Sequence, residues 1–195
     1  MSKRVEFFYD YGSPTTYLAW TQLPTIAACS GAEIVWRPML LGGVFKATGN
    51  RTPVEVAPKG RWMFTDMQRY AARYGVPFEM NPYFIVNTLS VMRGAVYALR
   101  EGFILPYNEA MFRAMWVDGR NLGDPAVVVD LLTEAGLDAE AIVAGAQDPQ
   151  VKRELMDRTN EAVVRGIFGA PSFFVGNDLY FGQDRLDWVE RALTA

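Results

Sequence analysis

The chain lacks histidine altogether and has a single cysteine, Cys29, among its 195 residues. The absence of histidine excludes Ser–His–Asp and Cys–His catalysis, histidine-ligated zinc and histidine as a general base. One thiol cannot form an intrachain disulfide, a Cys-x-x-Cys redox pair or a cysteine-rich metal site, so we expect no metal centre. Any chemistry must therefore use Ser, Thr, Tyr, Lys, Arg or carboxylate groups, or a reactive group brought in from outside the chain.

A strong excess of one charge is also missing, since 19 Lys and Arg residues stand against 22 Asp and Glu residues. The resulting net charge of −3 argues against nucleic acid and against an anionic membrane surface as partners. Charged residues occupy positions 3, 4, 6 and 10, where a signal peptide would have an apolar core. We therefore expect a cytoplasmic protein with no membrane span.

Local patterns over the first 38 residues predict a strand, a helix and a second strand. Residues 4–9 and 34–36 are rich in β-branched and aromatic side chains, which favour strands. Ser13 and Pro14 are typical of the N-cap and first position of a helix, which we expect to end near Cys29. We expect the Cys29 thiol to be packed and dispensable.

The pattern changes further along the chain. From about residue 58 to 166, apolar residues recur with helical period. Strand patterns return at 172–175 and 179–181 around a tight turn, and Asp184 is expected to cap a last helix. A long helical segment thus separates two regions that contain strands.

This element order predicts an α/β fold, a thioredoxin-like four-stranded mixed sheet with a large all-helical insertion. We expect residues 1–42 and 149–195 to form the thioredoxin-like domain and residues 43–148 to form the inserted helical domain. The alternative is a plain doubly wound sheet. That fold needs more alternation of strands and helices than residues 58–148 offer.

Three features could carry chemistry, and each also has a purely structural interpretation. Ser13 lies where a strand gives way to a helix, a place that favours anions, but it could simply cap the helix. Pro171 opens a strand and could be cis, or it could only interrupt a sheet edge. The run 181–185 could hold an α-amino acid end, or Asp184 could act as a cap alone.

Several runs of the sequence carry a family resemblance. They are 9–19 (YDYGSPTTYLA), 168–173 (FGAPSF) and 182–186 (GQDRL), with Asp66-x-x-Arg69 and 74–77 (YGVP) between them. In this order they resemble the 2-hydroxychromene-2-carboxylate isomerase family, which is related to the kappa-class glutathione transferases. The similarity spans essentially the whole chain.

The resemblance implies glutathione as the cofactor. Ser13 stands where redox relatives carry the first cysteine of Cys-x-x-Cys, and in this family it contacts the thiol of bound glutathione. The backbone of Ala170 and Pro171 would pair with the cysteinyl part of glutathione. Gly182, Gln183 and Asp184 match the segment that holds the γ-glutamyl end, and Phe181 beside them is also expected to bind the cofactor.

The same resemblance places substrate contacts at Lys46, Asn50, Arg51 and Phe84. Either cation could hold a substrate carboxylate. The chain departs from the family at Trp62, where many relatives have Tyr, and at 84–87 (FIVN), where the family has a Phe/Tyr-Pro-x-Asn-type loop. These departures bear on the identity of the substrate more than on the cofactor.

The function implied is a glutathione-dependent cis–trans isomerase that interconverts 2-hydroxychromene-2-carboxylate and trans-o-hydroxybenzylidenepyruvate, or a close aromatic analogue. Reversible addition of the glutathione thiolate would be covalent catalysis in which glutathione is not consumed. The expected partners are a small aromatic carboxylate and a second copy of the chain in a homodimer. Two alternatives stay open: a kappa-class-like glutathione transferase or peroxidase, and a non-catalytic binding protein with this or an unrelated fold.

Overall fold

The computed structural model describes residues 3–195. Its strands are β1 (Arg4–Tyr9), β2 (Glu33–Pro38), β3 (Ser172–Val175) and β4 (Asp178–Phe181). Its α-helices are α1 (Pro14–Ser30), α2 (Leu41–Thr48), α3 (Ala57–Tyr74), α4 (Leu89–Arg100), α5 (Ile104–Trp116), α6 (Pro125–Glu134), α7 (Ala139–Gln147), α8 (Pro149–Val164) and α9 (Leu186–Thr194). Two 3-10 turns complete the list, η1 (Pro53–Glu55) and η2 (Gln183–Arg185).

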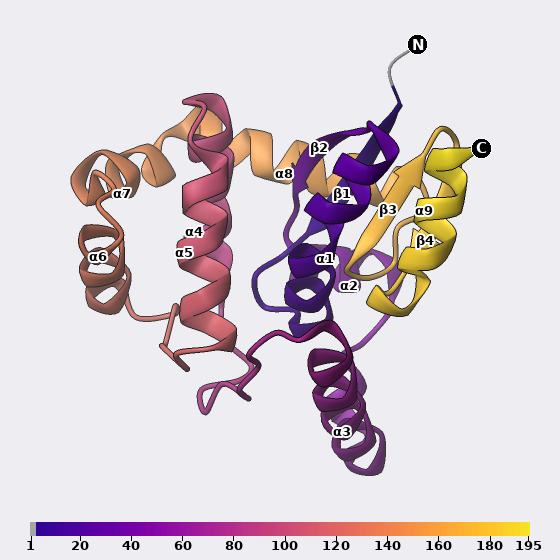
Figure 1. The fold of residues 1–195 in the computed structure, drawn as a ribbon. Coiled ribbons are helices and arrows are strands. Elements are labelled where there is room, and N and C mark those ends of the chain that lie inside the picture. The colour runs from indigo at the N-terminus through magenta and orange to yellow at the C-terminus, as the bar shows by residue number, and fades with distance from the viewer. Residues whose placement is uncertain (1–2) are drawn as a thin grey trace.

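The strands form one mixed sheet in the order β2–β1–β3–β4 (Figure 1). β1 is parallel to β2 and antiparallel to β3, and β4 is antiparallel to β3. Because α2 to α8 all lie between β2 and β3 in the chain, a long helical segment interrupts the sheet. The predicted thioredoxin-like four-stranded mixed sheet with an all-helical insertion is confirmed. The domain boundaries at 42/43 and 148/149 stay a prediction.

Side chains of β1 alternate between two apolar clusters, because successive residues of a strand point to opposite faces of the sheet. Phe7 and Tyr9 belong to the larger cluster, which also contains residues of α1 and α9. Phe8 belongs to the smaller cluster, with residues of α2 and α8. Phe7 also stacks on Phe173 of β3, with ring centroids 5.3 Å apart. Helices on both faces therefore hold β1 as a central, buried strand.

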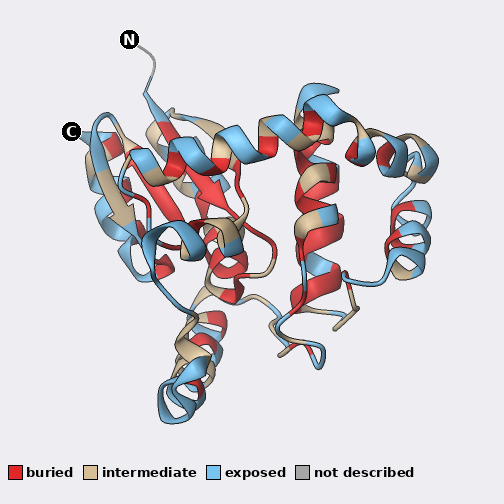
Figure 2. Ribbon diagram, turned by 180° about the vertical axis from the view of Figure 1, so that it is seen from behind, coloured by how far each residue is buried: buried red, intermediate tan, exposed pale blue. Residues whose placement is uncertain are grey.

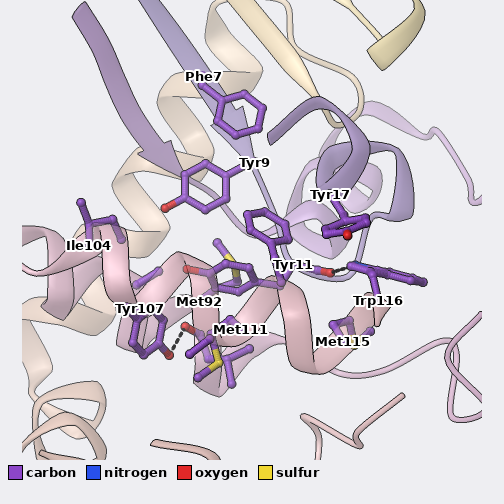
Figure 3. Close-up of a cluster of buried hydrophobic side chains, with 14 of the residues drawn as sticks. Phe7, Tyr9, Tyr11, Tyr17, Met92, Ile104, Tyr107, Met111, Met115 and Trp116 are labelled. Carbon is purple, nitrogen blue, oxygen red and sulfur yellow. Dashed lines mark hydrogen bonds between the residues drawn. The ribbon is translucent and has the colours of Figure 1, made fainter. Parts of the chain in front are cut away.

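A buried hydrogen-bond network joins the end of β1 to α5. The hydroxyls of Tyr9 and Tyr11 both donate to Asn108 Oδ1, at 3.0 and 2.6 Å. Trp116 Nε1 donates to the Tyr11 carbonyl at 2.8 Å, and Figure 3 shows these rings packed together with apolar side chains. The network gives partners to both tyrosine hydroxyls and to the Trp116 indole, whereas Asn108 Nδ2 stays buried without one. It joins α5 to the end of β1 and to Tyr11 in the turn that follows.

Burial is unevenly distributed over the helices. Figure 2 shows buried positions concentrated in the sheet and along the helices packed beside it, whereas α3 extends away from the sheet and carries many exposed positions. Among residues 3–195, no helix combines the length and the apolar character needed to cross a membrane.

Two local predictions are wrong. Asp184 does not cap the last helix: η2 intervenes, α9 begins at Leu186 without a side-chain cap, and the Asp184 carboxylate pairs with Arg185 at 2.6 Å. Cys29 is exposed rather than packed. Ala27 is the buried residue of that last turn of α1, and Cys29 lies about 200° further around the helix axis.

Candidate active site

Ser13 caps the helix that begins where β1 ends. Its Oγ accepts a hydrogen bond from the Thr16 amide at 3.2 Å, and Pro14 follows at the first helical position. This arrangement confirms the cap predicted from the sequence. Pro14 has no N–H and the Tyr17 amide donates to the Ser13 carbonyl at 3.2 Å, so the Thr15 amide is the first-turn donor without a helical partner. The macrodipole of this 17-residue helix adds partial positive charge there. The turn around Ser13 therefore favours an anion.

The loop before β3 lies against this turn. The Ala170–Pro171 peptide bond is cis. Because β3 is the antiparallel neighbour of β1, Ser172 stands opposite Phe8 and the start of β3 meets the end of β1. The Ser13 hydroxyl lies 3.2 Å from the Ala170 carbonyl oxygen, across 157 positions of sequence. The two segments therefore lie side by side at one end of the sheet, and their role in binding a cofactor stays a prediction.

The segment after β4 forms a third wall. The Gly182 amide donates to the Pro171 carbonyl at 3.0 Å, which fastens the 182–184 turn to the cis-proline loop. Gly182 has φ of 100°, a conformation that other residues rarely adopt, and a Cβ there would collide with the Asp184 carboxylate. From α3, the Tyr74 hydroxyl donates to the Gln183 carbonyl at 3.0 Å, and burial raises the pKa of Tyr74 to about 12. The turn is thus held from two sides.

These walls enclose a cleft with a volume of about 380 Å³. Of the residues predicted to bind cofactor or substrate, those that line it are Ser13, Asn50, Arg51, Phe84, Ala170, Phe181, Gly182, Gln183 and Asp184. Pro171 is buried behind Ala170, and Lys46 is exposed on α2; neither lines the cleft. A volume of this size is within the range of small-molecule sites.

Aromatic side chains line the cleft together with charged residues of both signs, which are Arg51, Lys59, Asp66 and Asp184. Trp62 is 61% exposed and lines it, as do Phe168 and Phe181, whose ring centroids are 4.7 Å apart. Arg51 is largely exposed and lies 3.5 Å from Glu55, a pair that solvent screens strongly. Asn50 Nδ2 donates to the Phe168 carbonyl at 2.8 Å and ties the 50–52 segment to the rim.

A second, mostly apolar hollow of about 290 Å³ continues from the cleft. The residues that line both are Gly12, Leu41, Phe45, Thr52 and Phe84. The two hollows thus meet beside the Ser13 turn. An apolar ring system could occupy the second hollow while polar groups remain in the first.

Sequence reasoning missed the role of Asp10. Its buried carboxylate accepts hydrogen bonds of 2.8 Å from the Gly12 amide, the Leu41 amide and the Thr88 hydroxyl. Burial raises the pKa of Asp10, and these three donors oppose the rise. Asp10 therefore joins the Ser13 turn to the starts of α2 and α4. The sequence did contain a signal for this role: Asp10 directly follows a buried strand and stands two residues before Gly12.

Thr15 was also missed. Its hydroxyl lies 3.0 Å from Ser13 Oγ and 3.3 Å from the Ala170 carbonyl oxygen, and the residue lines the cleft. No sequence signal indicated this role, because threonine is common in the first turn of helices.

Comparison with known proteins agrees with this geometry. The sequence profile of the DSBA-like thioredoxin domain matches residues 4–194. A protein from Sphingobium xenophagum named 2-hydroxychromene-2-carboxylate isomerase is 32% identical over 195 residues, which cover 99% of each chain. The human protein named glutathione S-transferase kappa 1 is 26% identical over 211 residues, covering 99% of this chain and 92% of its own.

Solved structures agree as well. A structure of 2-hydroxychromene-2-carboxylate isomerase superposes with a TM-score of 0.88 and 26% identity, covering 97% of this chain and 94% of that one. A probable DsbA oxidoreductase from Streptomyces coelicolor, at 22% identity and a TM-score of 0.76, shares the fold. The chain therefore belongs to the DSBA-like thioredoxin family and, within it, to the 2-hydroxychromene-2-carboxylate isomerase family, whose named members are enzymes.

Proposed function

We propose that the chain is a glutathione-dependent cis–trans isomerase that interconverts 2-hydroxychromene-2-carboxylate and trans-o-hydroxybenzylidenepyruvate, or a close aromatic analogue. One observation carries the proposal. An uncharged hydroxyl, that of Ser13, lies at the N-terminus of α1, 3.2 Å from the carbonyl before a cis-proline and on the wall of an open cleft. A bound thiolate would be stabilised there and could not form a disulfide with residue 13, which is a serine.

The residues present fit a glutathione thiol. Its pKa in solution is close to that of free cysteine, about 8.5, so it is mostly protonated at neutral pH. Lowering this pKa by about 1.5 requires about 2 kcal/mol. A hydrogen bond from Ser13 to a thiolate contributes roughly 1.5–3 kcal/mol, and the helix dipole adds roughly 0.3–2 kcal/mol. These two contributions are sufficient without a histidine or a metal.

When bound, glutathione would supply a thiolate that adds reversibly to an unsaturated carbon of the substrate and departs after a single bond has rotated. The chain would hold the rest of the tripeptide. Gln183 and Asp184 lie at the far wall of the cleft, where the Asp184 carboxylate can accept from an ammonium. Its present partner, Arg185, is half exposed, so exchange of one cation for another costs little.

The substrate would be a bicyclic aromatic carboxylate. Phe84 lines both the cleft and the second hollow and can pack against an aromatic ring. Of the two cations predicted to bind the carboxylate, Arg51 lines the cleft and Lys46 does not. We therefore assign the carboxylate to Arg51, whose guanidinium can bind it through two parallel hydrogen bonds.

The test is turnover of 2-hydroxychromene-2-carboxylate, followed by ultraviolet absorbance, with and without glutathione. We expect turnover only with glutathione, and we expect all of the glutathione to be recovered unchanged. A glutathione conjugate as product would favour a transferase, the activity named for the kappa-class relatives. A calorimetric titration in which glutathione produces no binding heat would overturn both and leave a non-catalytic binding protein.

We further propose that the protein is a cytoplasmic homodimer. The support is the family resemblance carried by the motifs at 9–19, 168–173 and 182–186. Light scattering coupled to size exclusion tests the dimer: a mass of one chain, 21.9 kDa, would contradict it.

A further inference from the structure

The hydroxyl of Ser13 has more acceptors within reach than it has protons. A serine hydroxyl carries one proton and two lone pairs. One lone pair accepts from the Thr16 amide at 3.2 Å. The proton can be donated to the Ala170 carbonyl, 3.2 Å away, or to the Thr15 hydroxyl, 3.0 Å away. A thiolate in the cleft must compete with both of these acceptors for a single proton.

The Thr15 hydroxyl can remove itself from this competition by acting as a donor to Ser13 Oγ rather than as an acceptor. It is half-buried in the first turn of α1, and it lies within hydrogen-bond distance of both Ser13 Oγ and the Ala170 carbonyl oxygen. If Thr15 donates to Ser13 Oγ, both lone pairs of that oxygen are filled, by Thr15 and by the Thr16 amide. The Ser13 proton then points away from both donors, and the acceptors left for it are the Ala170 carbonyl and the thiolate, of which the anionic thiolate is the stronger. A hydroxyl that accepts two hydrogen bonds also donates more strongly.

We propose that Thr15 is a positioning residue: its hydroxyl donates to Ser13 Oγ and so directs the Ser13 proton to the sulfur of bound glutathione. This inference rests on the proposed function, because it needs a thiolate in the cleft. It adds a residue that acts through Ser13 and need not touch the sulfur. The order of donation is Thr15 to Ser13 and Ser13 to the thiolate, and no bond other than hydrogen bonds changes.

The experiment measures the pKa of the bound glutathione thiol from the ultraviolet absorbance of its thiolate, together with the pH profile of kcat/KM. Thr15→Val keeps the shape of the side chain and removes the hydroxyl. Thr15→Ser keeps the hydroxyl. We expect Thr15→Val to raise the pKa of the bound thiol by about 0.5 to 1, the equivalent of losing one ordinary hydrogen bond. We expect Thr15→Ser to restore the native value.

Two controls separate this role from a structural one. Thr21→Val removes a hydroxyl that donates to the Leu18 carbonyl on the same helix, and it should leave the pKa of the bound thiol unchanged. In a Ser13→Ala background, Thr15→Val should have no further effect on that pKa, because two residues that act through one group are not additive.

The outcomes also distinguish this inference from the proposed function. Native protein that neither binds glutathione nor shows its thiolate would overturn both. A second outcome is that the native protein binds and ionises glutathione but Thr15→Val leaves the pKa of the bound thiol unchanged. That outcome would overturn the role of Thr15 alone. An undiminished effect of Thr15→Val in the Ser13→Ala background would do the same, since Thr15 would then not act through Ser13.

Discussion

Replacing Ser13 with alanine removes two interactions of different size and kind. The first is the cap, in which Ser13 Oγ accepts from the Thr16 amide, and its loss should lower the free energy of unfolding by about 0.5–2 kcal/mol. The second is the hydrogen bond to a bound thiolate, which contributes roughly 1.5–3 kcal/mol. Because each pKa unit corresponds to about 1.4 kcal/mol, the pKa of the bound thiol should rise by about 1 to 2.

The assay is a pH titration of glutathione bound to native protein and to Ser13→Ala, with turnover measured over the same pH range. We expect the rising limb of the pH profile to move to higher pH and turnover at neutral pH to fall roughly ten- to a hundredfold. Asp124→Ala is the matched control, because it removes a side-chain cap from α6, where Asp124 accepts from the Ala126 amide at 2.9 Å. Asp124→Ala should lower the free energy of unfolding without changing the pKa of the bound thiol.

The reasoning fails if Ser13→Ala lowers stability but leaves the pKa of the bound thiol and the pH profile as they were. The dipole of α1 and the backbone amides would then stabilise the thiolate by themselves, and Ser13 would be only a helix cap. Equal effects of Ser13→Ala and Asp124→Ala on turnover would lead to the same conclusion.

Three further predictions concern stability and Cys29. Hydrogen bonding to Arg165, aided by Arg37, lowers the pKa of Glu6. The stability that the ionised Glu6 carboxylate contributes is therefore present above its ordinary pKa of 4.5 and is lost as pH falls through the lowered value. Glu6→Gln should flatten this acid decline in thermal melts, and an unchanged decline would contradict the prediction. Asn108→Ala should cost about 2–4 kcal/mol in urea unfolding, because two tyrosine hydroxyls lose their acceptor; a loss below about 0.5 kcal/mol would contradict this. Cys29→Ser should leave folding and turnover unchanged, since the thiol is exposed and distant from Ser13, and a selective loss of turnover would show otherwise.

Features that depend on nearby residues could be read from the sequence. The Ser13 cap, the positions of the strands and the interruption of the sheet by a helical segment follow from side-chain patterns and from hydrogen bonds within a single turn. The absence of histidine and of a second cysteine likewise limited the reactive group to a hydroxyl, an amine, a guanidinium, a carboxylate or a group brought in from outside the chain. Prediction failed at the start of the last helix, because Asp184 lies within the 3-10 turn η2 that precedes α9 and does not cap α9.

Tertiary structure alone decided what faces the cleft. Ser13 and Ala170 meet only because β1 and β3 pair antiparallel, and the same packing brings Arg51 to the cleft and leaves Lys46 on the exposed side of α2. Cys29 is exposed to solvent because the opposite face of α1 packs against the core. These outcomes depend on contacts between segments far apart in the chain, whose geometry is set by the packing of whole elements and is not encoded in any local pattern.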